Sequence, residues 1–401
     1  MVCVPALNSP MKPLHPQIAE LKSSPIRDVA NAGLGREDVL AFWFGESDEV
    51  TPPAVREAAI ASLERGETFY AHNLGLPELR EAIAQYTTGL HERARQDHLG
   101  PERIAVTSGG VSALMLAMQA ILGAGDECLV VTPIWPNLMA QPQILGAHLR
   151  TFSLQPVQGL WQLNLPALLE QITPQTRMVV LNSPNNPSGW TLSRLEQEAI
   201  LDRCRQTGTW ILADEVYERL YYGDAPCAPS FLDIATPDDA LLVAHSFSKS
   251  FLMTGWRLGW LVVPPALTDT LGKLIEFNTS CAPVFVQRAA LAALAQAASI
   301  TPPLVAHLKT CRDVLVQCLQ QIPGVQVAPA PAGMYVFFRL DGMNDGVEVA
   351  KRLVHEAGLG LAPGEAFGRT SAGWLRWCFA SRDLERLRLG VQRLQAWMKQ
   401  A

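Results

Sequence analysis

From about residue 103 to 263, short apolar runs alternate with helical patterns, and this alternation limits the folds open to the chain. The apolar runs are Arg103–Thr107, Cys128–Thr132, Leu149–Leu154, Met178–Asn182, Trp210–Ala213, Leu241–Ser246 and Gly259–Val263. Helical patterns lie between them near 110–122, 137–145 and 193–206. Strands that are largely apolar and separated by helices are typical of a parallel sheet covered on both faces. The sequence therefore predicts an α/β fold with a mostly parallel, seven-stranded sheet.

The ends of the chain show a different pattern. Before the first strand, one helix is expected from Pro53 and a second over about Pro77–Arg95. After about residue 300, long helical patterns surround two short strands, Met334–Arg339 and Trp374–Phe379. Such a mixture is typical of a smaller α+β unit. We therefore predict an N-terminal segment that joins the small domain (1–50), a large domain (51–299) and the C-terminal part of the small domain (300–401).

Composition argues against several classes of protein. With 48% hydrophobic and 17% charged residues among 401, the chain can bury an extensive core, so it is not a disordered protein. A net charge of −6 argues against a nucleic-acid-binding protein, because such proteins carry a basic face. The eight cysteines include no CxxC pair and no spacing suited to zinc. We expect no metal site, and reduced, mostly buried thiols.

Two long uncharged stretches need to be considered as membrane spans. Ile104–Gly125 is interrupted by glycines and Cys128–Leu149 by prolines, so both are expected to be strands and helices joined by turns. The first fifteen residues contain prolines where a signal peptide needs an unbroken apolar run. The sequence thus predicts a soluble, cytoplasmic protein with no membrane partner.

Polar residues follow several of the predicted strands, where an open α/β sheet binds its ligands. Ser108-Gly109-Gly110 follows the first strand and opens a helix, so its backbone N–H groups suit a phosphate, although such turns are also common without a ligand. The loop 182–189, NSPNNPSG, follows the fourth strand. A plain loop uses the same residue types, yet its asparagines are placed to hold a ligand oxygen.

Two charged residues give sharper signals. Asp214 ends the fifth strand and needs a partner, because an unpaired buried carboxylate is costly. That partner is either a structural cation or the protonated ring nitrogen of a cofactor. Lys249 lies between serines directly after the sixth strand, eight residues before Arg257. An exposed lysine is the simpler interpretation, but a Schiff-base lysine flanked by phosphate-binding Ser and Arg accounts for every polar residue of the segment.

These motifs occur in an informative order: NNPSG at 185–189, DEVY at 214–217 and SFSKSF…GWRLG at 246–259. In this order the chain resembles the class I/II aminotransferases, pyridoxal-phosphate (PLP) enzymes of the aspartate aminotransferase superfamily with fold type I. The resemblance runs from Ser24-Pro-Ile-Arg27 to Leu375-Arg-Trp377. It implies a homodimer with pyridoxal 5'-phosphate that moves an amino group from an L-amino acid to a 2-oxo acid by a ping-pong mechanism.

The resemblance also implies roles for individual residues. Lys249 would form the internal aldimine and shuttle a proton, and Asp214 would pair with the pyridine nitrogen. Asn186 and Tyr217 would donate hydrogen bonds to the phenolic oxygen of PLP. The implied phosphate ligands are Ser108, Gly109, Gly110, Ser246, Ser248 and Arg257, together with Tyr70 of the partner subunit.

Further implied roles concern the cofactor ring and the substrate. Trp135 would stack on the cofactor, Arg376 would bind the substrate α-carboxylate, and Gly45 and Asn186 would lie near that carboxylate. Dicarboxylate-specific relatives use a second arginine, but no arginine lies between Arg257 and Arg288.

The side chain of the amino donor is predicted from the same region. Arg27 and Arg36 could replace the missing arginine, but each is expected to be a surface charge. The aromatic run 42–44 adds bulk near the expected pocket, although core packing is favoured for it. The sequence therefore favours neutral or aromatic amino donors over aspartate.

A PLP-dependent C–S lyase or decarboxylase on the same fold would share every cofactor residue, so the motifs do not separate it from an aminotransferase. A non-catalytic PLP-sensing regulator would need a DNA-binding module, and residues 1–50 are too short and not basic. We expect amino acid and 2-oxo acid substrates, and no nucleic-acid partner.

Overall fold

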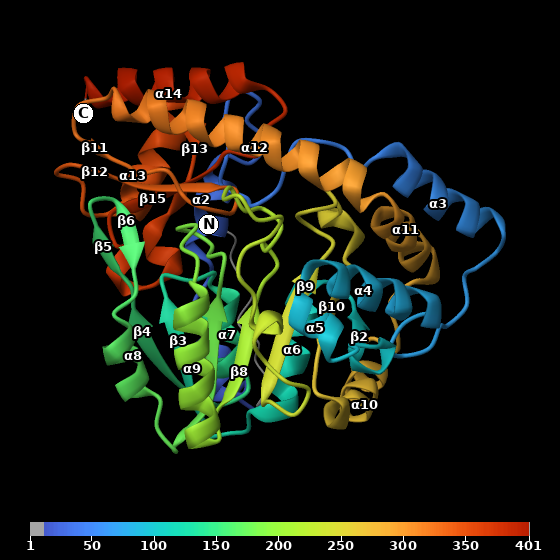
Figure 1. Ribbon diagram of the computed structural model, residues 1–401. Helices are drawn as coiled ribbons and strands as arrows, with labels where there is room; N and C mark the ends of the chain where they lie inside the picture. The colour runs from blue at the N-terminus through green and yellow to red at the C-terminus, as the bar shows by residue number, and fades with distance from the viewer. Residues whose placement is uncertain (1–11, 401) are drawn as a thin grey trace.

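A mixed seven-stranded sheet forms the centre of the molecule, as the alternating pattern predicts (Figure 1). The computed structural model describes residues 12–400. The strand order is β2-β10-β9-β8-β7-β3-β4, in which β10 is antiparallel to both neighbours and the other pairs are parallel. The strands are β2 (Ile104–Thr107), β3 (Glu127–Thr132), β4 (His148–Ser153), β7 (Thr176–Asn182), β8 (Trp210–Asp214), β9 (Leu241–Ser246) and β10 (Gly259–Val262).

The two faces of this sheet belong to two different hydrophobic cores. Successive side chains of a strand point to opposite faces, and in β3 Val130 belongs to one core while Val131 belongs to the other. The first core is covered by α6 (Gly110–Ile121), α7 (Asn137–Ile144) and α10 (Thr268–Asn278). The second is covered by α3 (Pro53–Glu64), α4 (Pro77–Leu90), α8 (Leu165–Gln171), α9 (Arg194–Thr207) and α11 (Val284–Ala295). Burial on both faces explains why the inner strands are largely apolar, whereas the edge strand β4 is partly exposed and more polar.

Local signals in the sequence mark the ends of these helices. At the start of α9, Ser193 and Glu196 form a capping box in which each side chain accepts from the other's backbone N–H. The helix ends at Gly208, whose φ of 71° lies in the left-handed region that favours glycine. Prolines occupy the first turns of α3 and α4, where a missing N–H costs nothing. Local sequence therefore marks where α3, α4 and α9 begin and where α9 ends.

A second, smaller sheet is built from the C-terminal part of the chain. Its order is β11-β12-β15-β14, and its strands are β11 (Val325–Gln326), β12 (Tyr335–Leu340), β14 (Ala362–Pro363) and β15 (Trp374–Cys378). The surrounding helices include α12 (Ala297–Gln320), α13 (Gly346–Arg352) and α14 (Leu384–Met398). The central pair β12 and β15 corresponds to the two strands predicted from the sequence.

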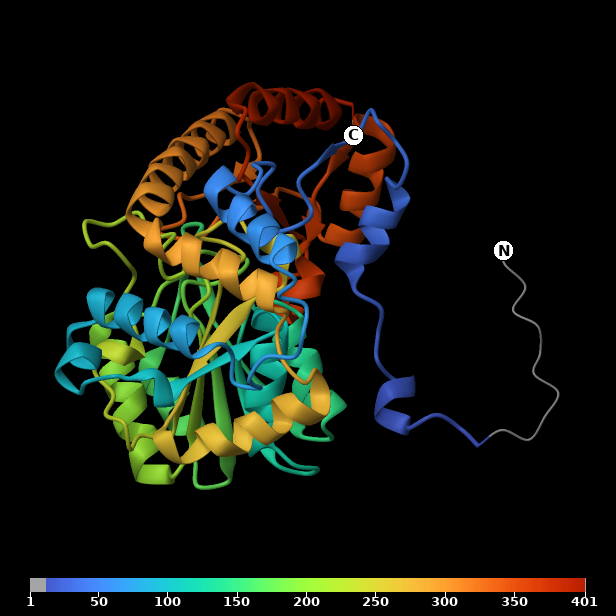
Figure 2. The same cartoon turned by 90° about the vertical axis from the view of Figure 1, so that its right-hand side faces the viewer.

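The N-terminal segment packs against this C-terminal unit. β1 (Leu40–Ala41) pairs in parallel with β13 (Leu359–Gly360), and α2 (Pro25–Ala32) contacts α13, beside which it lies in Figure 2. These contacts support the proposed small domain from both ends of the chain. Its boundaries at residues 50 and 300 stay predictions, and α12 continues through residue 300.

The helix predicted over 77–95 is wrong in one respect. α4 ends at Leu90, and a separate short helix, α5 (Glu92–Gln96), follows. His91 between them has extended backbone angles, and its ring is buried against Glu218 at 3.1 Å and Asp233 at 3.3 Å. The pattern of apolar residues cannot reveal this break, because the two carboxylates come from a distant part of the chain.

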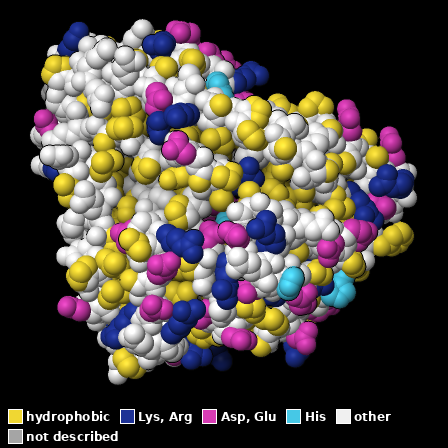
Figure 3. All heavy atoms as spheres, viewed as in Figure 1, with side chains coloured by type: hydrophobic (Ala, Val, Ile, Leu, Met, Phe, Trp, Pro, Cys, Tyr) yellow, Lys and Arg dark blue, Asp and Glu magenta, His cyan; other side chains and the backbone are white. Residues whose placement is uncertain are grey.

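The surface mixes side chains of both charges. On the face viewed in Figure 3, Lys and Arg alternate with Asp and Glu, and hydrophobic side chains lie between them. Within residues 12–400, no single helix is long and apolar enough to cross a membrane. Only the pair α11 and α12 passes that test of length and composition, and it is bent by 76°.

Candidate active site

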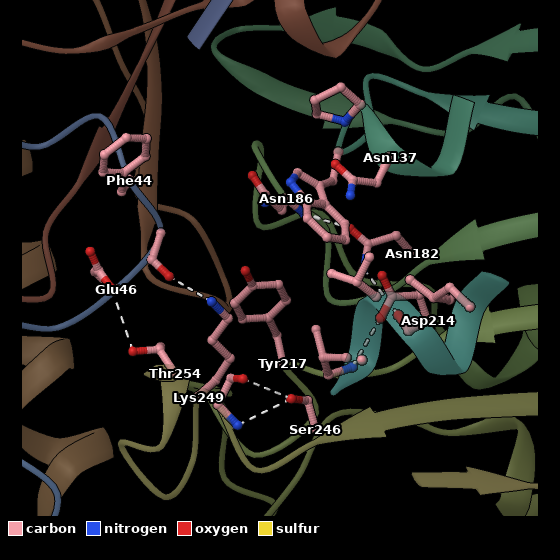
Figure 4. A pocket seen from close by; sticks show the side chains of 18 of the residues that line it. Phe44, Glu46, Asn137, Asn182, Asn186, Asp214, Tyr217, Ser246, Lys249 and Thr254 are labelled. Atoms are coloured by element: carbon pink, nitrogen blue, oxygen red, sulfur yellow. Dashed lines mark hydrogen bonds between the residues drawn. The ribbon is translucent and has the colours of Figure 1, made fainter. Parts of the chain in front are cut away.

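A cavity of about 710 Å³ lies where the carboxyl ends of β7, β8 and β9 meet the smaller sheet. Ligands are expected at this edge of an open α/β sheet. Residues following three neighbouring strands, among them Asn186, Asp214 and Lys249, line it together with the N-terminus of α6 (Figure 4). The N-terminal segment contributes Gly45, and the smaller sheet contributes Arg376. The site is thus assembled from both units of the molecule.

Asp214 ends β8 and is 2% exposed. One of its oxygens accepts a long bond of 3.4 Å from the Val216 N–H, and no cationic side chain of residues 12–400 lies within salt-bridge distance of it. Burial raises the pKa of this carboxyl to about 7, partly offset by that bond and by the charge of Lys249. Such a carboxylate is stabilised by a cation placed against it. The cavity therefore offers a strong site for a positively charged ligand group.

Lys249 follows β9 and reaches into the same space. Its Nζ donates to the Gly45 carbonyl at 2.5 Å and lies 5.7 Å from the centre of the Tyr217 ring. Burial, aided by the nearby Arg376 and Arg257 guanidinium groups, lowers the pKa of this amine to about 8. A lysine with a lowered pKa is more readily present as the neutral amine, which is the nucleophilic form.

An anion-binding corner lies beside Lys249. Ser246 Oγ bonds to Ser248 Oγ at 2.9 Å and accepts from the Ser248 N–H. Gly110 opens α6 here, so the positive end of a twelve-residue helix faces the same corner. A Cβ at Gly109 would lie 2.6 Å from the Arg257 guanidinium, so the glycine leaves that group room to approach the turn. Hydroxyls, a helix N-terminus and a cation together suit a phosphate.

Arg376, on β15, is buried in the opposite wall. It donates from Nη1 to Asn186 Oδ1 at 2.8 Å and from Nη2 to the Trp43 carbonyl at 2.5 Å. The guanidinium carbon lies 4.5 Å from the Tyr335 ring centre and 4.9 Å from that of Phe367. Its Nε has no partner within residues 12–400. A buried guanidinium that is fixed by two hydrogen bonds and two aromatic rings is suited to bind a carboxylate.

Most of the site residues predicted from the sequence lie on this cavity. They are Gly45, Gly110, Trp135, Asn186, Asp214, Tyr217, Ser246, Ser248, Lys249, Arg257 and Arg376. Ser108 and Gly109 lie behind the lining, although Gly109 contacts Arg257. Tyr70 does not reach this cavity, and its side chain is 89% exposed. The individual roles inferred for these residues stay predictions.

Some lining residues were not foreseen. Tyr335 at the start of β12 lines the cavity, and its hydroxyl lies 2.7 Å from that of Tyr217. A tyrosine at the start of a largely apolar strand is common, so the sequence gives no signal that Tyr335 lines the cavity. Arg27 also lines the cavity, with its guanidinium 5.0 Å from the centre of the Phe44 ring, although it was expected as a surface charge. Arg36 is paired with Asp38, as a surface charge would be.

The aromatic run before Gly45 divides between two environments. Phe42 and Trp43 are buried in the core, as favoured from the sequence, whereas Phe44 is partly exposed and lines the cavity. The three residues follow β1 in irregular chain, so no strand periodicity sets which way each ring faces. Phe44 therefore adds an apolar surface on the side of the cavity where Arg27 lies.

Comparison with known proteins agrees with the geometry. The chain matches the family model "Aminotransferase class I and II" over residues 38–394. It is 33% identical to the "Probable aspartate/prephenate aminotransferase" of Aquifex aeolicus, over 96% of this chain and 98% of that protein. It is also 33% identical to an arginine–pyruvate transaminase of Pseudomonas aeruginosa, over 85% of each.

Solved structures give the same result for the fold. A mutant of Thermus thermophilus aspartate aminotransferase superposes with a TM-score of 0.88 at 30% identity, covering 96% of this chain and all of that one. Fold type I is thereby confirmed for this α/β chain. The family match spans nearly the whole molecule, including every strand of the central sheet. The chain therefore belongs to the class I and II aminotransferases, and it is an aminotransferase.

Proposed function

We propose that this aminotransferase holds pyridoxal 5'-phosphate on Lys249 and alternates between an L-amino acid and a 2-oxo acid in a ping-pong mechanism. One observation carries the proposal. Asp214 and Arg376 are buried, oppositely charged and without ion-pair partners among residues 12–400, yet both line one cavity with Lys249. Burying such unpaired charged groups lowers the stability of the fold unless a ligand supplies the opposite charges.

The donor set suits this cofactor. The unpaired Asp214 would hold a protonated pyridine nitrogen, and the corner of Ser246, Ser248 and Arg257 would hold the phosphate. Asn186 and Tyr217 would donate to the phenolic oxygen. The Trp135 ring, at the lining, would lie on the face of the pyridine. Each polar part of the cofactor thus has a counterpart in the cavity.

When bound, the cofactor supplies an electron sink for the bond broken at the substrate Cα and carries the amino group between substrates. Asp214 would keep the ring nitrogen protonated, which the sink requires. Lys249 Nζ would take the proton from the substrate Cα and return it to C4' of the cofactor, and its lowered pKa suits both proton transfers. Arg376 holds the α-carboxylate and so orients the Cα–H bond.

Two donor classes are supported by different observations. Phe44 in the lining agrees with the neutral or aromatic donors favoured from the sequence. Arg27 beside it offers a cation for an acidic side chain, which weakens the argument that no second arginine is available. Donors of both classes therefore belong in the substrate screen.

We further propose a homodimer in which Tyr70 reaches the phosphate of the partner subunit. Phe69 and Tyr70 are 84% and 89% exposed, and Phe277 is 89% exposed. Large aromatic side chains left in water are typical of an interface. Tyr70 does not line the cavity of its own chain, as expected of a residue that serves another subunit.

We place the enzyme in the cytoplasm. The seven cysteines between residues 12 and 400 are free thiols. Five of these seven are buried, and a reducing compartment keeps such thiols reduced.

The test of the cofactor site is covalent capture. Borohydride treatment of the yellow holoenzyme should fix the cofactor on Lys249, as shown by peptide mapping. Lys249→Ala should still bind the cofactor through Asp214 and Arg257 but lose multiple turnover. An adduct on another lysine would refute the assignment.

The reaction is tested separately from the cofactor site. An amino acid without a leaving group should convert the bound cofactor to its amine form, and 2-oxoglutarate or pyruvate should convert it back. A C–S lyase would instead release ammonia and pyruvate from cysteine-type substrates with no such half-reaction, and that outcome would contradict the amino-transfer mechanism.

A further inference from the structure

Tyr335 connects the two units of the molecule inside the cavity. It opens β12 of the smaller sheet, is 1% exposed and lies edge-to-face with Tyr217 of the large unit, the two ring centres being 5.7 Å apart. Their hydroxyl oxygens are 2.7 Å apart, which is the usual length of an O–H···O hydrogen bond. No other hydrogen-bond partner of the Tyr335 hydroxyl occurs among residues 12–400.

The position of the Tyr335 hydroxyl is set on several sides. A Cβ at Gly45 would lie only 2.0 Å from this oxygen, so the hydroxyl packs directly against the Gly45 backbone. The Arg376 guanidinium lies over its ring at 4.5 Å. A ring held by a backbone, a guanidinium and a second tyrosine cannot easily turn its hydroxyl elsewhere. The hydroxyl is therefore directed to Tyr217.

The geometry favours one direction for this hydrogen bond. Either hydroxyl can donate in the contact, but the Tyr335 oxygen has no other partner among residues 12–400. Each phenol carries one hydrogen, so a Tyr335 hydrogen that lies toward the Tyr217 oxygen leaves the Tyr217 hydrogen available to a ligand in the cavity. Burial raises the pKa of both phenols, which keeps both hydrogens in place.

We propose that Tyr335 is a positioning residue that donates to the Tyr217 hydroxyl and thereby aims and strengthens the hydrogen bond that Tyr217 gives to the phenolic oxygen of the cofactor. This inference rests on the proposed cofactor site. A hydroxyl that accepts one hydrogen bond becomes a stronger donor of the next, because the bonds polarise one another. In this arrangement Tyr335 acts through the Tyr217 hydroxyl.

The consequence is measurable in the holoenzyme. Donors to the phenolic oxygen stabilise its anion and lower the pKa of the protonated nitrogen that links Lys249 to the cofactor. Tyr335→Phe keeps the ring on Arg376 but removes the donor. The pKa of the linkage, followed by the pH dependence of the cofactor's visible absorbance, should rise by roughly half a pH unit, since such polarisation adds only a fraction of a bond.

A double-mutant cycle separates this role from a structural one. Tyr217→Phe should raise the same pKa by more than Tyr335→Phe does. The double variant should match Tyr217→Phe alone, because Tyr335 acts only through the Tyr217 hydroxyl. Additive shifts, no shift in Tyr335→Phe, or a fall in the pKa would overturn the proposal.

The matched control is Tyr222→Phe. Tyr222 is a buried tyrosine that donates to the Gly333 carbonyl at 2.5 Å and does not line the cavity. The Tyr222→Phe variant should lose about as much thermal stability as Tyr335→Phe. The pKa of its Lys249–cofactor linkage should be unchanged. A shift in this control equal to that of Tyr335→Phe would assign the effect to general loosening and overturn the proposal. A wild-type protein without any titrating cofactor band would instead contradict the proposed cofactor site.

Discussion

Single side chains in this cavity carry charges that the protein itself does not neutralise. Asp214 and Arg376 are each almost fully buried, and both are held by neutral hydrogen-bonding groups. Stability alone would favour an internal ion pair or apolar side chains at these positions. Their arrangement is understandable when a ligand brings a cation to one and a carboxylate to the other.

Arg27 gives a prediction about substrate choice at the same scale. Arg27→Met should lower kcat/KM for aspartate and glutamate by about tenfold to a hundredfold if a side-chain carboxylate binds there, and should leave methionine and leucine unaffected. The measurement is the single-turnover rate of conversion of the bound cofactor with each donor. Arg36→Met is the control, because Arg36 lies in the same segment but pairs with Asp38. Equal losses for acidic and neutral donors would show that Arg27 does not select the side chain.

At the scale of elements, the break between α4 and α5 is explained by a buried ion pair. His91 lies between Glu218 and Asp233, and the bonds to these carboxylates outweigh burial and raise the pKa of its imidazole to about 10. The pKa of Glu218 is lowered by His245 and His91 against the effect of burial. A charged histidine here draws the backbone out of the helix so that its ring can reach both acids.

His91→Leu should therefore destabilise the fold by about 3–5 kcal/mol at neutral pH, because it leaves Glu218 buried without its partner. The pKa of His91 is raised in the folded state, so its contribution is complete below pH 6.5 and is lost as the pH rises through about 10. Urea unfolding should show that the free energies of unfolding of wild type and His91→Leu differ less at pH 9.5 than at pH 7. The exposed His148→Leu should show no such trend. A difference that grows with pH would contradict the charged state of His91.

At the scale of the whole molecule, the exposed Tyr70 predicts a site completed by a second subunit. Tyr70→Ala and Lys249→Ala should each be nearly inactive alone. After subunits exchange, one of the two sites in each mixed dimer regains both residues, so part of the activity should return. Native mass spectrometry would verify that exchange has occurred. Mixed dimers with no activity would indicate that Tyr70 does not serve the neighbouring site.

The central sheet and the positions of most predicted site residues follow from local sequence. Apolar strands alternating with helices depend on neighbours within a few residues, and so do the caps of α9 and the turns after the strands. Asn186, Asp214 and Lys249 lie in short motifs at strand ends, and the parallel order of those strands brings them together. The local sequence pattern is sufficient to predict such features, because the carboxyl ends of neighbouring parallel strands lie at the same edge of the sheet.

The tertiary structure alone decided the contacts between distant segments. The Tyr335 hydroxyl meets that of Tyr217 across 118 residues, and His91 meets Glu218 across 127. Arg27 reaches the cavity because α2 packs against the C-terminal unit. Nothing within the neighbouring sequence of these residues sets their partners. Their positions follow from how the two sheets and the N-terminal segment pack, and packing depends on the shape of the whole core.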